Sequence, residues 1–233
     1  MTRLDDYKIR SYELKEVGFR YPTGDIVLGD VSLDFSSSPI WHVCGPSGHG
    51  QSTLLRIMAF LVEPTAGSIL VNGQNATEMS FEEFLPWRLE IGYTFDMGGL
   101  LANRSLMENL ALPHMYHNLS VYEDVHDAIR AVAKRFRFEH LLDRRPALVS
   151  GGLRKLATIL RSVLLQPSFL VMDDPFGGLD METARELSRF IGELQKNSDI
   201  DTICLTSRLP DWPAQMGARP LWVEDGCVKE RAA

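Results

Sequence analysis

The strongest constraint on the fold is a glycine-rich segment, GPSGHGQST at residues 45–53, which separates an apolar run from a run with helical periodicity. Residues 40–44, IWHVC, are apolar enough for a buried strand, and in QSTLLRIMAFL the apolar residues recur at helical spacing. The order strand, glycine loop, helix favours an α/β fold. In such folds the ligands usually lie at the carboxyl ends of parallel strands.

The rest of the chain continues this alternation. Residues 12–35 alternate polar and apolar side chains around YPTGD, which predicts antiparallel strands, and GSILVNG predicts a further strand. Residues 104–145 predict a helical insert. After the insert the predicted order is helix (GLRKLATILRSVLL), strand (FLVMD), helix (METARELSRFIGELQK) and strand (TICLT). We therefore expect a mainly parallel sheet, an N-terminal antiparallel β region and a helical insert.

Composition narrows the function. The chain of 233 residues is 45% hydrophobic and 24% charged, which is typical of a globular protein, and its net charge of −7 argues against nucleic-acid binding. The odd number of cysteines, three, argues against a disulfide framework. The N-terminal residues MTRLDDYKIR lack the apolar core of a signal peptide. No run approaches the roughly 18 apolar residues that span a bilayer. We expect a cytoplasmic protein that meets a membrane only through another chain.

The glycine-rich segment fits a phosphate-binding loop at most positions. Gly45, Gly50 and Ser52 match the pattern G-x-x-x-x-G-K-[ST], but Gln51 stands where the lysine belongs. Backbone N–H groups and the positive end of the following helix can hold an anion without lysine. The hydroxyl of Ser52 is placed to bind Mg²⁺. The simpler alternative is a glycine-rich turn that only opens a helix.

Two further segments have a possible role at the same site. In FLVMDDPFGGLD an apolar strand ends at Asp173, whose carboxylate could hold Mg²⁺, and Asp174 follows directly. In VSGGL, Ser150, Gly151 and Gly152 precede a helix and could form a second anion site. The alternatives are a solvated turn for the aspartates and a simple helix cap for Ser150.

Taken together and in this order, these segments resemble the nucleotide-binding subunit of ATP-binding cassette (ABC) transporters over nearly the whole chain. The resemblance implies a P-loop NTPase core in one cassette, residues 1–233, with the core and β subdomain at about 1–95 and 155–233 and a helical subdomain at about 96–154. It implies that ATP and Mg²⁺ bind. It also implies that Tyr21 in FRYPTGD stacks on adenine, although an ordinary core or surface aromatic is the alternative. The residues that would contact nucleotide are Tyr21, Gly45, Ser47, Gly48, Gly50, Gln51, Ser52, Thr53, Ser150, Gly151 and Gly152.

Four positions depart from the family pattern at the chain's own nucleotide. Gln51 replaces lysine, Asp96 in IGYTFD replaces glutamine, Asp174 replaces glutamate, and Ser207 in CLTSR replaces histidine. Charge-assisted hydrogen bonds contribute about 1.5 to 3 kcal/mol against about 1 kcal/mol for neutral ones, so ATP binding should weaken without disappearing. Hydrolysis should suffer more, because phosphoryl transfer depends on positioning and on charge stabilisation.

The expected catalytic positions are therefore Asp174, Ser207 and Asp96, and the expected metal ligands are Ser52, Asp173 and Asp96. The carboxylate of Asp174 is shorter than that of glutamate, and Ser207 is too short to replace an imidazole. Asp96 adds negative charge near the phosphates, which is repulsive unless Mg²⁺ intervenes.

The resemblance also implies the partners, a separate transmembrane permease and a second cassette subunit. Two such subunits pair head to tail, through a loop that GGLD ending at Asp180 matches, so that each signature segment (here VSGGL) completes the site of the other. Because the signature glycines are intact, although Leu153 replaces its final glutamine, a heterodimer with one working site is the leading hypothesis. A homodimer would have two damaged sites, and a non-catalytic assembly scaffold is the alternative function.

Residues 95–118 resemble subunits of bacterial lipid trafficking, of the Mla and MCE type, and somewhat less those of lipoprotein-releasing systems. In the family this stretch meets the permease. Its apolar residues have two interpretations, permease contact or subdomain core, and they are Leu100, Leu101, Leu106 and Met107.

Overall fold

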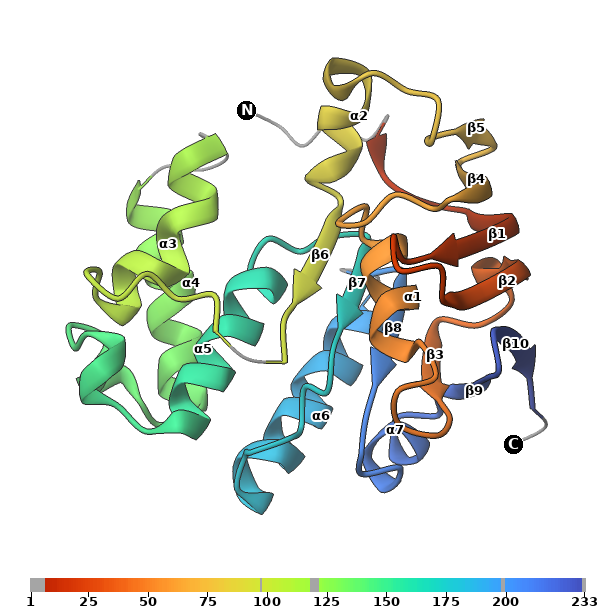
Figure 1. Ribbon diagram of the computed structural model, residues 1–233. Helices are drawn as coiled ribbons and strands as arrows, with labels where there is room; N and C mark the ends of the chain where they lie inside the picture. The colour runs from red at the N-terminus through yellow and green to blue at the C-terminus, as the bar shows by residue number, and fades with distance from the viewer. Residues whose placement is uncertain (1–6, 97, 118–121, 198–199, 232–233) are drawn as a thin grey trace.

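The computed structural model describes residues 7–96, 98–117, 122–197 and 200–231. Two sheets and a group of helices make up this part of the chain (Figure 1). The first sheet is antiparallel with the order β2-β1-β4-β5. Its strands are β1 (Tyr12–Arg20), β2 (Ile26–Asp34), β4 (Ala66–Val71) and β5 (Gln74–Asn75). The antiparallel N-terminal region that the alternating pattern predicted is thereby confirmed.

The second sheet has the order β10-β9-β3-β8-β7-β6 and is parallel except at β10. Sequence patterns predicted β3, β7 and β8 but not β6, β9 and β10. The strands are β3 (Ile40–Cys44), β6 (Ile91–Thr94), β7 (Phe169–Met172), β8 (Thr202–Thr206), β9 (Arg219–Glu224) and β10 (Cys227–Glu230).

Helices cover both faces of the parallel sheet. α1 (Gln51–Met58) packs between the two sheets, and its buried side chains join Trp41 and Val43 of β3 in one core. The opposite face packs on α5 (Gly151–Val163) and α6 (Met181–Lys196) through alternate residues such as Leu170 and Met172. This alternation between the two faces is the period of a strand. Shorter helices are α2 (Phe81–Arg88) and α7 (Asp211–Gln215).

The predicted helical insert contains α3 (Leu106–His117) and α4 (Tyr122–Arg135), which lie beside α5 at the left of Figure 1. Leu106 and Met107 are buried in the core that α3 shares with α5, whereas the side chain of Leu101 is 43% exposed. The core interpretation therefore holds for the first two residues. Short 3-10 segments, Phe35–Ser37, Glu139–Leu141 and Pro146–Leu148, complete the described elements.

Strand register brings the ends of four parallel strands to one edge. Val43 pairs with Thr206, Met172 with Leu205, and Thr94 with Met172. The loops that follow β3, β8, β7 and β6 therefore leave the sheet side by side. Those loops are the ones that contain the predicted site residues.

None of the described helices is long and apolar enough to cross a membrane. The three cysteines, Cys44, Cys204 and Cys227, are free thiols.

Candidate functional site

The loop after β3 requires glycine at two places. Gly45 and Gly50 have positive φ, and a Cβ on Gly45 would lie 2.0 Å from the carbonyl oxygen of Val223. A Cβ on Gly50 would lie 2.8 Å from Cγ1 of Val27. Gly50 is also the N-cap of α1 and makes no side-chain capping bond. The first N–H groups of α1 thus face the loop, as an anion site needs.

Gln51 is directed back onto this loop. Its Nε2 donates a 2.7 Å hydrogen bond to the carbonyl oxygen of Pro46. The side chain therefore stabilises the loop conformation, and it brings no formal charge to it. The only histidine, lysine, arginine or acidic residue of residues 45–53 is His49, whose Nδ1 lies 3.4 Å from a carboxylate oxygen of Asp225.

Ser52 and Asp173 meet although they are 121 residues apart in sequence. Oγ of Ser52 donates to Oδ1 of Asp173 at 3.1 Å, and Oγ1 of Thr206 donates to the same oxygen at 2.8 Å. Asp173 is 7% exposed. A hydroxyl and a buried carboxylate at this separation are the hard oxygen ligands that Mg²⁺ prefers, so these two residues fit the metal. No cluster of three or more His, Cys, Asp or Glu side chains that could hold an ion occurs among the described residues.

Asp174 is buried next to the pair formed by Ser52 and Asp173. Its backbone N–H donates to Oγ1 of Thr206 at 2.9 Å, and its Oδ1 accepts from the backbone N–H of Arg208 at 3.3 Å. Oδ2 lies 3.3 Å from Nε of Arg208. The residue has φ of 45°, and a Cβ on Gly177 would lie 2.3 Å from Oδ2. The carboxylate is therefore confined between Arg208 and a position that has room only for glycine.

Asp96 follows β6 and lies between two cations. Nζ of Lys155, on α5, is 3.0 Å from Oδ1 of Asp96, and Nη2 of Arg208 is 3.0 Å from Oδ2. The Lys155 side chain is 8% exposed, and it also donates to the backbone carbonyl oxygens of Asp96 and Asp173. The negative charge of Asp96 is thus compensated by the protein itself, a relationship that sequence reasoning missed.

Ser207 also lies at this edge, but its hydroxyl is used locally. Oγ donates to the carbonyl oxygen of Leu209 at 2.9 Å and accepts from the backbone N–H of Leu209 at 3.1 Å. Beneath it, His42 of β3 is buried, and burial lowers the pKa of its imidazole while a hydrogen bond with the backbone of Ser207 partly opposes that shift.

These residues line one pocket of about 430 Å³ at the carboxyl edge of the sheet. The structure thus brings together most of the predicted site residues, and it adds Arg56 and Arg208. The lining residues are Val43, Cys44, Gly45, Ser47, Gly48, Gln51, Ser52, Arg56, Asp96, Asp173, Asp174, Thr206, Ser207 and Arg208.

Tyr21 lies at the margin of this site. Its ring is 42% exposed, and its hydroxyl is 3.3 Å from Oγ1 of Thr53 on α1. Phe19 supports the ring edge-on at a centroid distance of 5.0 Å. An exposed aromatic fixed next to the phosphate loop could stack on a flat ligand.

Ser150, Gly151 and Gly152 do not line the pocket. Ser150 is exposed and caps α5, its Oγ accepting from the N–H of Leu153 at 3.1 Å. Gly152 packs close to the loop before α6, where a Cβ would lie 3.3 Å from the carbonyl oxygen of Gly178. Ser150 therefore acts as a helix cap, and its exposure leaves the first N–H groups of α5 at the surface.

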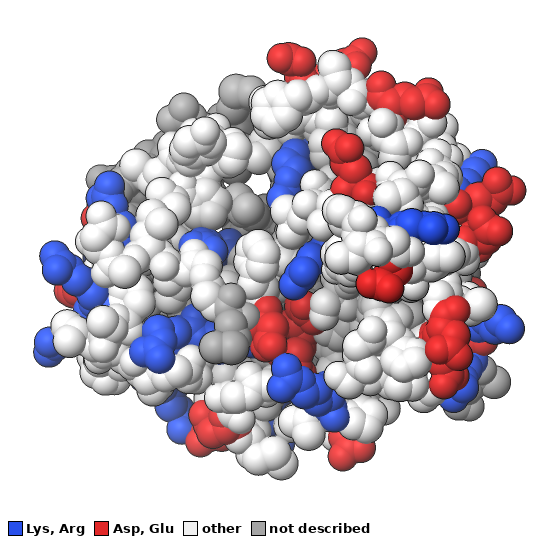
Figure 2. Space-filling view, viewed as in Figure 1, with Lys and Arg blue, Asp and Glu red and all other residues white. Residues whose placement is uncertain are grey.

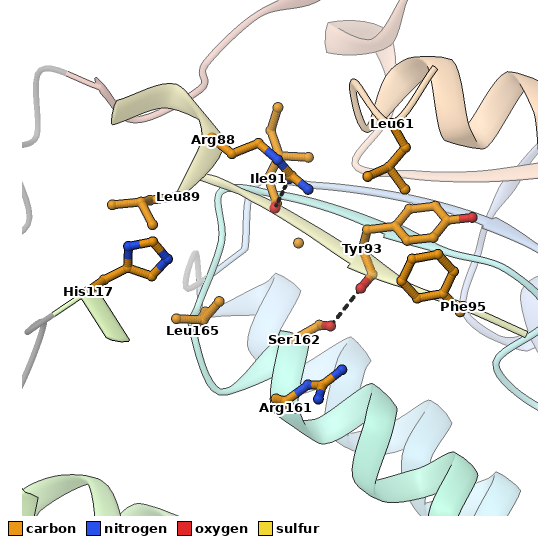
Figure 3. Close-up of a pocket in the computed structure, with 11 residues that line it drawn as sticks. Leu61, Arg88, Leu89, Ile91, Tyr93, Phe95, His117, Arg161, Ser162 and Leu165 are labelled. Atoms are coloured by element: carbon orange, nitrogen blue, oxygen red, sulfur yellow. Dashed lines mark hydrogen bonds between the residues drawn. The ribbon is translucent and has the colours of Figure 1, made fainter. Parts of the chain in front are cut away.

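A second pocket, of about 330 Å³, lies between β6, α2, α3 and α5 (Figure 3). Leu61, Tyr93 and Phe95 form one side of it, and Leu89, His117 and Leu165 the other. Two of its lining residues are arginines, Arg88 and Arg161, and burial lowers the pKa of both guanidinium groups. Figure 2 shows basic side chains around the hollow between α3–α5 and the sheets.

Known proteins are similar to this chain in sequence and in fold. The sequence model of a family described as ABC transporter matches residues 28–177. The phosphonates import ATP-binding protein PhnC 2 of Synechococcus sp. (strain JA-2-3B'a(2-13)) is 34% identical over 79% of this chain and 71% of its own length. The lipoprotein-releasing system ATP-binding protein LolD 1 of Rhodopirellula baltica is 34% identical over 84% of this chain and 87% of its own.

Solved structures agree. The dimeric bacterial ABC transporter cassette MJ0796 matches with a TM-score of 0.85 at 25% identity, over 94% of this chain and 97% of that one. A second structure of that cassette, a post-hydrolysis state bound to ADP and Pi, matches the fold with a TM-score of 0.86 at 24% identity over the same shares.

Proposed function

The chain belongs to the ABC transporter family, and from that premise we propose that this nucleotide-binding subunit has a weakened ATP site of its own and lends an intact signature segment to a competent second cassette. ATP-binding subunits of this family bind ATP with Mg²⁺, dimerise and work with a separate membrane permease. The observation that carries the proposal is a contrast within one chain. Gln51 bonds to its own loop, whereas Ser150 and Gly151 stand exposed at the start of α5 and Gly152 is half-buried beside them.

Binding and hydrolysis differ in what they need. The glycine loop and the start of α1 can hold phosphates through backbone N–H groups, and Ser52 with Asp173 fits Mg²⁺. Hydrolysis at the same site needs a base that reaches the attacking water. Asp174 is confined beside Gly177 and Arg208, and the Ser207 hydroxyl bonds to Leu209. We therefore propose that this site binds ATP and turns it over slowly.

The heterodimer is tested by comparing two variants of this chain in the assembled complex with its permease and second cassette. Ser150→Arg should abolish most of the ATPase rate, because it blocks the surface that completes the other site. Gln51→Ala should leave most of the rate. Ser80→Arg, which replaces the N-cap serine of α2, is the matched control and should leave the rate intact.

Two outcomes would contradict this proposal. If Gln51→Ala lowers the rate as much as Ser150→Arg, the chain's own site is the working one. If no combination of subunits hydrolyses ATP, the alternative function, a non-catalytic scaffold for assembly or regulation, is correct. The ion pair between Arg208 and Asp174 favours that alternative, since it occupies the carboxylate that a base would use.

We propose that the second pocket contacts the permease, and that the subunit works at the cytoplasmic face of the inner membrane. Phe95 and His117 belong to residues 95–118, the stretch that resembles the permease-contacting region of the family, of which Met97 and Asn118 lie outside the described residues. Phe95→Asp should release the subunit from the complex without changing its ATP affinity. Ile26→Asp, at a more exposed apolar position of β2, should leave the complex intact.

The transported molecule that we propose is a lipid or a lipid-linked protein. Support comes from the resemblance of residues 95–118 to lipid-trafficking subunits and from the lipoprotein-releasing relative. The phosphonate-import relative is also 34% identical to this chain, so sequence identity does not distinguish the two substrates. A transport experiment is needed. In proteoliposomes the complex should respond to phospholipid or lipoprotein with an increased ATPase rate, and a response to alkylphosphonate alone would contradict the assignment.

We also propose the domain limits implied by the family, with residues 96–154 as a helical subdomain within one cassette of residues 1–233.

A further inference from the structure

We propose that Arg208 supplies the phosphates of the bound nucleotide with the positive charge that Gln51 cannot supply. This inference rests on the proposed function, since it concerns the same ATP site. The cation of the site then lies on the loop that follows β8 instead of on the phosphate loop. The site is then rearranged rather than simply deprived of a charge.

The phosphate loop itself offers no strong cation. Residues 45–53 contain no lysine or arginine, and His49 is engaged with Asp225. Gln51 uses one amide hydrogen on Pro46. A phosphate in this loop would meet backbone N–H groups but no lysine or arginine of the loop itself.

Arg208 is placed to fill that gap. It lines the same pocket as Gln51 and Ser52, and it follows Ser207, where the family pattern has histidine. Its side chain is 77% exposed and is tethered at the pocket by Asp96 and Asp174, at 3.0 and 3.3 Å. The planar guanidinium group suits two-point contact with phosphate oxygens better than an ammonium group does.

Releasing Arg208 affects its two carboxylates differently. Asp96 keeps its buried partner Lys155, whose Nζ lies 3.0 Å from Oδ1. The pair with Asp96 is exposed on both sides, at 77% and 38%, and contributes little to stability. The side chain of Asp174 is only 6% exposed, so losing its ion pair has a desolvation cost that the phosphates must offset. Asp174 retains the hydrogen bond from the backbone N–H of residue 208, which does not depend on the guanidinium group. A multiply charged phosphate chain is a stronger attraction than either carboxylate.

Charge balance points the same way. The charged side chains that line the pocket are two arginines and three aspartates, which are Arg56, Arg208, Asp96, Asp173 and Asp174. Mg²⁺ on Asp173 and Lys155 behind Asp96 offset two of the negative charges. Without Arg208, only Arg56 would remain among the lining residues to face an anionic ligand.

The test measures Mg-ATP affinity of the purified full chain by calorimetry for four forms. They are the wild type, Arg208→Ala, Gln51→Lys, and the double variant Gln51→Lys/Arg208→Ala. Arg208→Ala should weaken binding on the order of tenfold, the loss expected for a charge-assisted hydrogen bond. In the double variant the new lysine should restore most of that loss, because one cation replaces the other.

Two controls isolate the effect. Arg130→Ala removes the same charge from an ion pair on α4, away from the pocket, and should leave the affinity unchanged. Arg208→Lys keeps the charge but loses the two-point contact, so its affinity should lie between those of the wild type and Arg208→Ala.

The outcomes separate this inference from the proposed function. If the wild type binds no Mg-ATP, alone or assembled, the proposed function fails. If the wild type binds and Arg208→Ala binds equally well or more tightly, only this inference fails, and in the second case Arg208 is a lock that competes with nucleotide. Weakening by Arg56→Ala with no effect of Arg208→Ala would also overturn it, by assigning the cation to α1.

Discussion

Nζ of Lys155 lies 3.0 Å from Oδ1 of Asp96, so the helix that starts at the signature segment is joined to the loop that follows β6. The two residues are unequally buried, with side-chain exposures of 8% for Lys155 and 38% for Asp96. Removing either partner should therefore have different consequences, because a buried charge that loses its partner retains its desolvation cost.

Asp96→Ala is expected to lower the free energy of unfolding by about 1–3 kcal/mol, since it leaves the Lys155 ammonium with backbone carbonyls only. Lys155→Met should cost less, because Asp96 keeps Arg208 and contact with solvent. Urea unfolding measures both. Asp127→Ala, which breaks the exposed pair with Arg130, should change stability by less than about 1 kcal/mol. Equal losses for Asp96→Ala and Lys155→Met would show that burial does not govern this pair.

Gln51→Lys should tighten Mg-ATP binding by about 2- to 30-fold, the difference between a charge-assisted and a neutral hydrogen bond. The ATPase rate of the chain alone should stay low, because Asp174 and Ser207 are unchanged. Calorimetry and a steady-state assay measure the two quantities. A rate that rises in proportion to affinity would mean that Gln51 alone limits this site.

Asp173→Asn should remove the dependence of ATP affinity on magnesium. In the wild type, chelation of the metal by EDTA should weaken ATP binding, because Ser52 and Asp173 are the oxygen pair that fits the ion. In the variant the affinities with Mg²⁺ and with EDTA should be similar. Asp201→Asn, which alters a carboxylate paired with Lys8 elsewhere, should behave like the wild type. A full magnesium effect in Asp173→Asn would place the metal on other residues.

His42 should make the protein less stable as the pH falls. Burial lowers the pKa of this imidazole below its ordinary value of 6.5, so the unfolded chain takes up the proton first. The free energy of unfolding should therefore decrease as the pH drops through about 6.5, and level off once the pH is below the pKa of the folded state. His42→Gln should flatten this dependence in urea titrations between pH 7 and 5.

His117 is the matched control, since burial also lowers the pKa of its imidazole. If His117→Gln flattens the profile and His42→Gln does not, the titrating group lies in the second pocket.

The sequence predicted the parts of the site that depend on local pattern. β3, the glycine loop and α1 follow one another within about twenty residues, and the apolar run before Asp173 gives β7 directly. The edge at which they meet followed from the expectation of parallel strands. Motif order was also sufficient to place Ser52 and Asp173 together.

Long-range ion pairs were beyond such reasoning. Lys155 is 59 residues from Asp96 and Arg208 is 112 residues from it, so no local spacing connects them. In the sequence, Lys155 looks like an ordinary polar residue of an amphipathic helix. Arg208 looks like an ordinary charged residue of a surface turn, so neither is marked as a partner of Asp96. β9 and β10 were missed because RPLWVE and CVKE mix charged residues with short apolar pairs.

The confinement of Asp174 between Gly177 and Arg208 has a consequence for attempts to re-engineer hydrolysis. The backbone at this position is in the left-handed region, which aspartate tolerates better than most longer side chains. A glutamate introduced alone would have to find a path past both neighbours. Residues 174, 177 and 208 therefore depend on one another sterically, and a gain of turnover requires that all three be exchanged together.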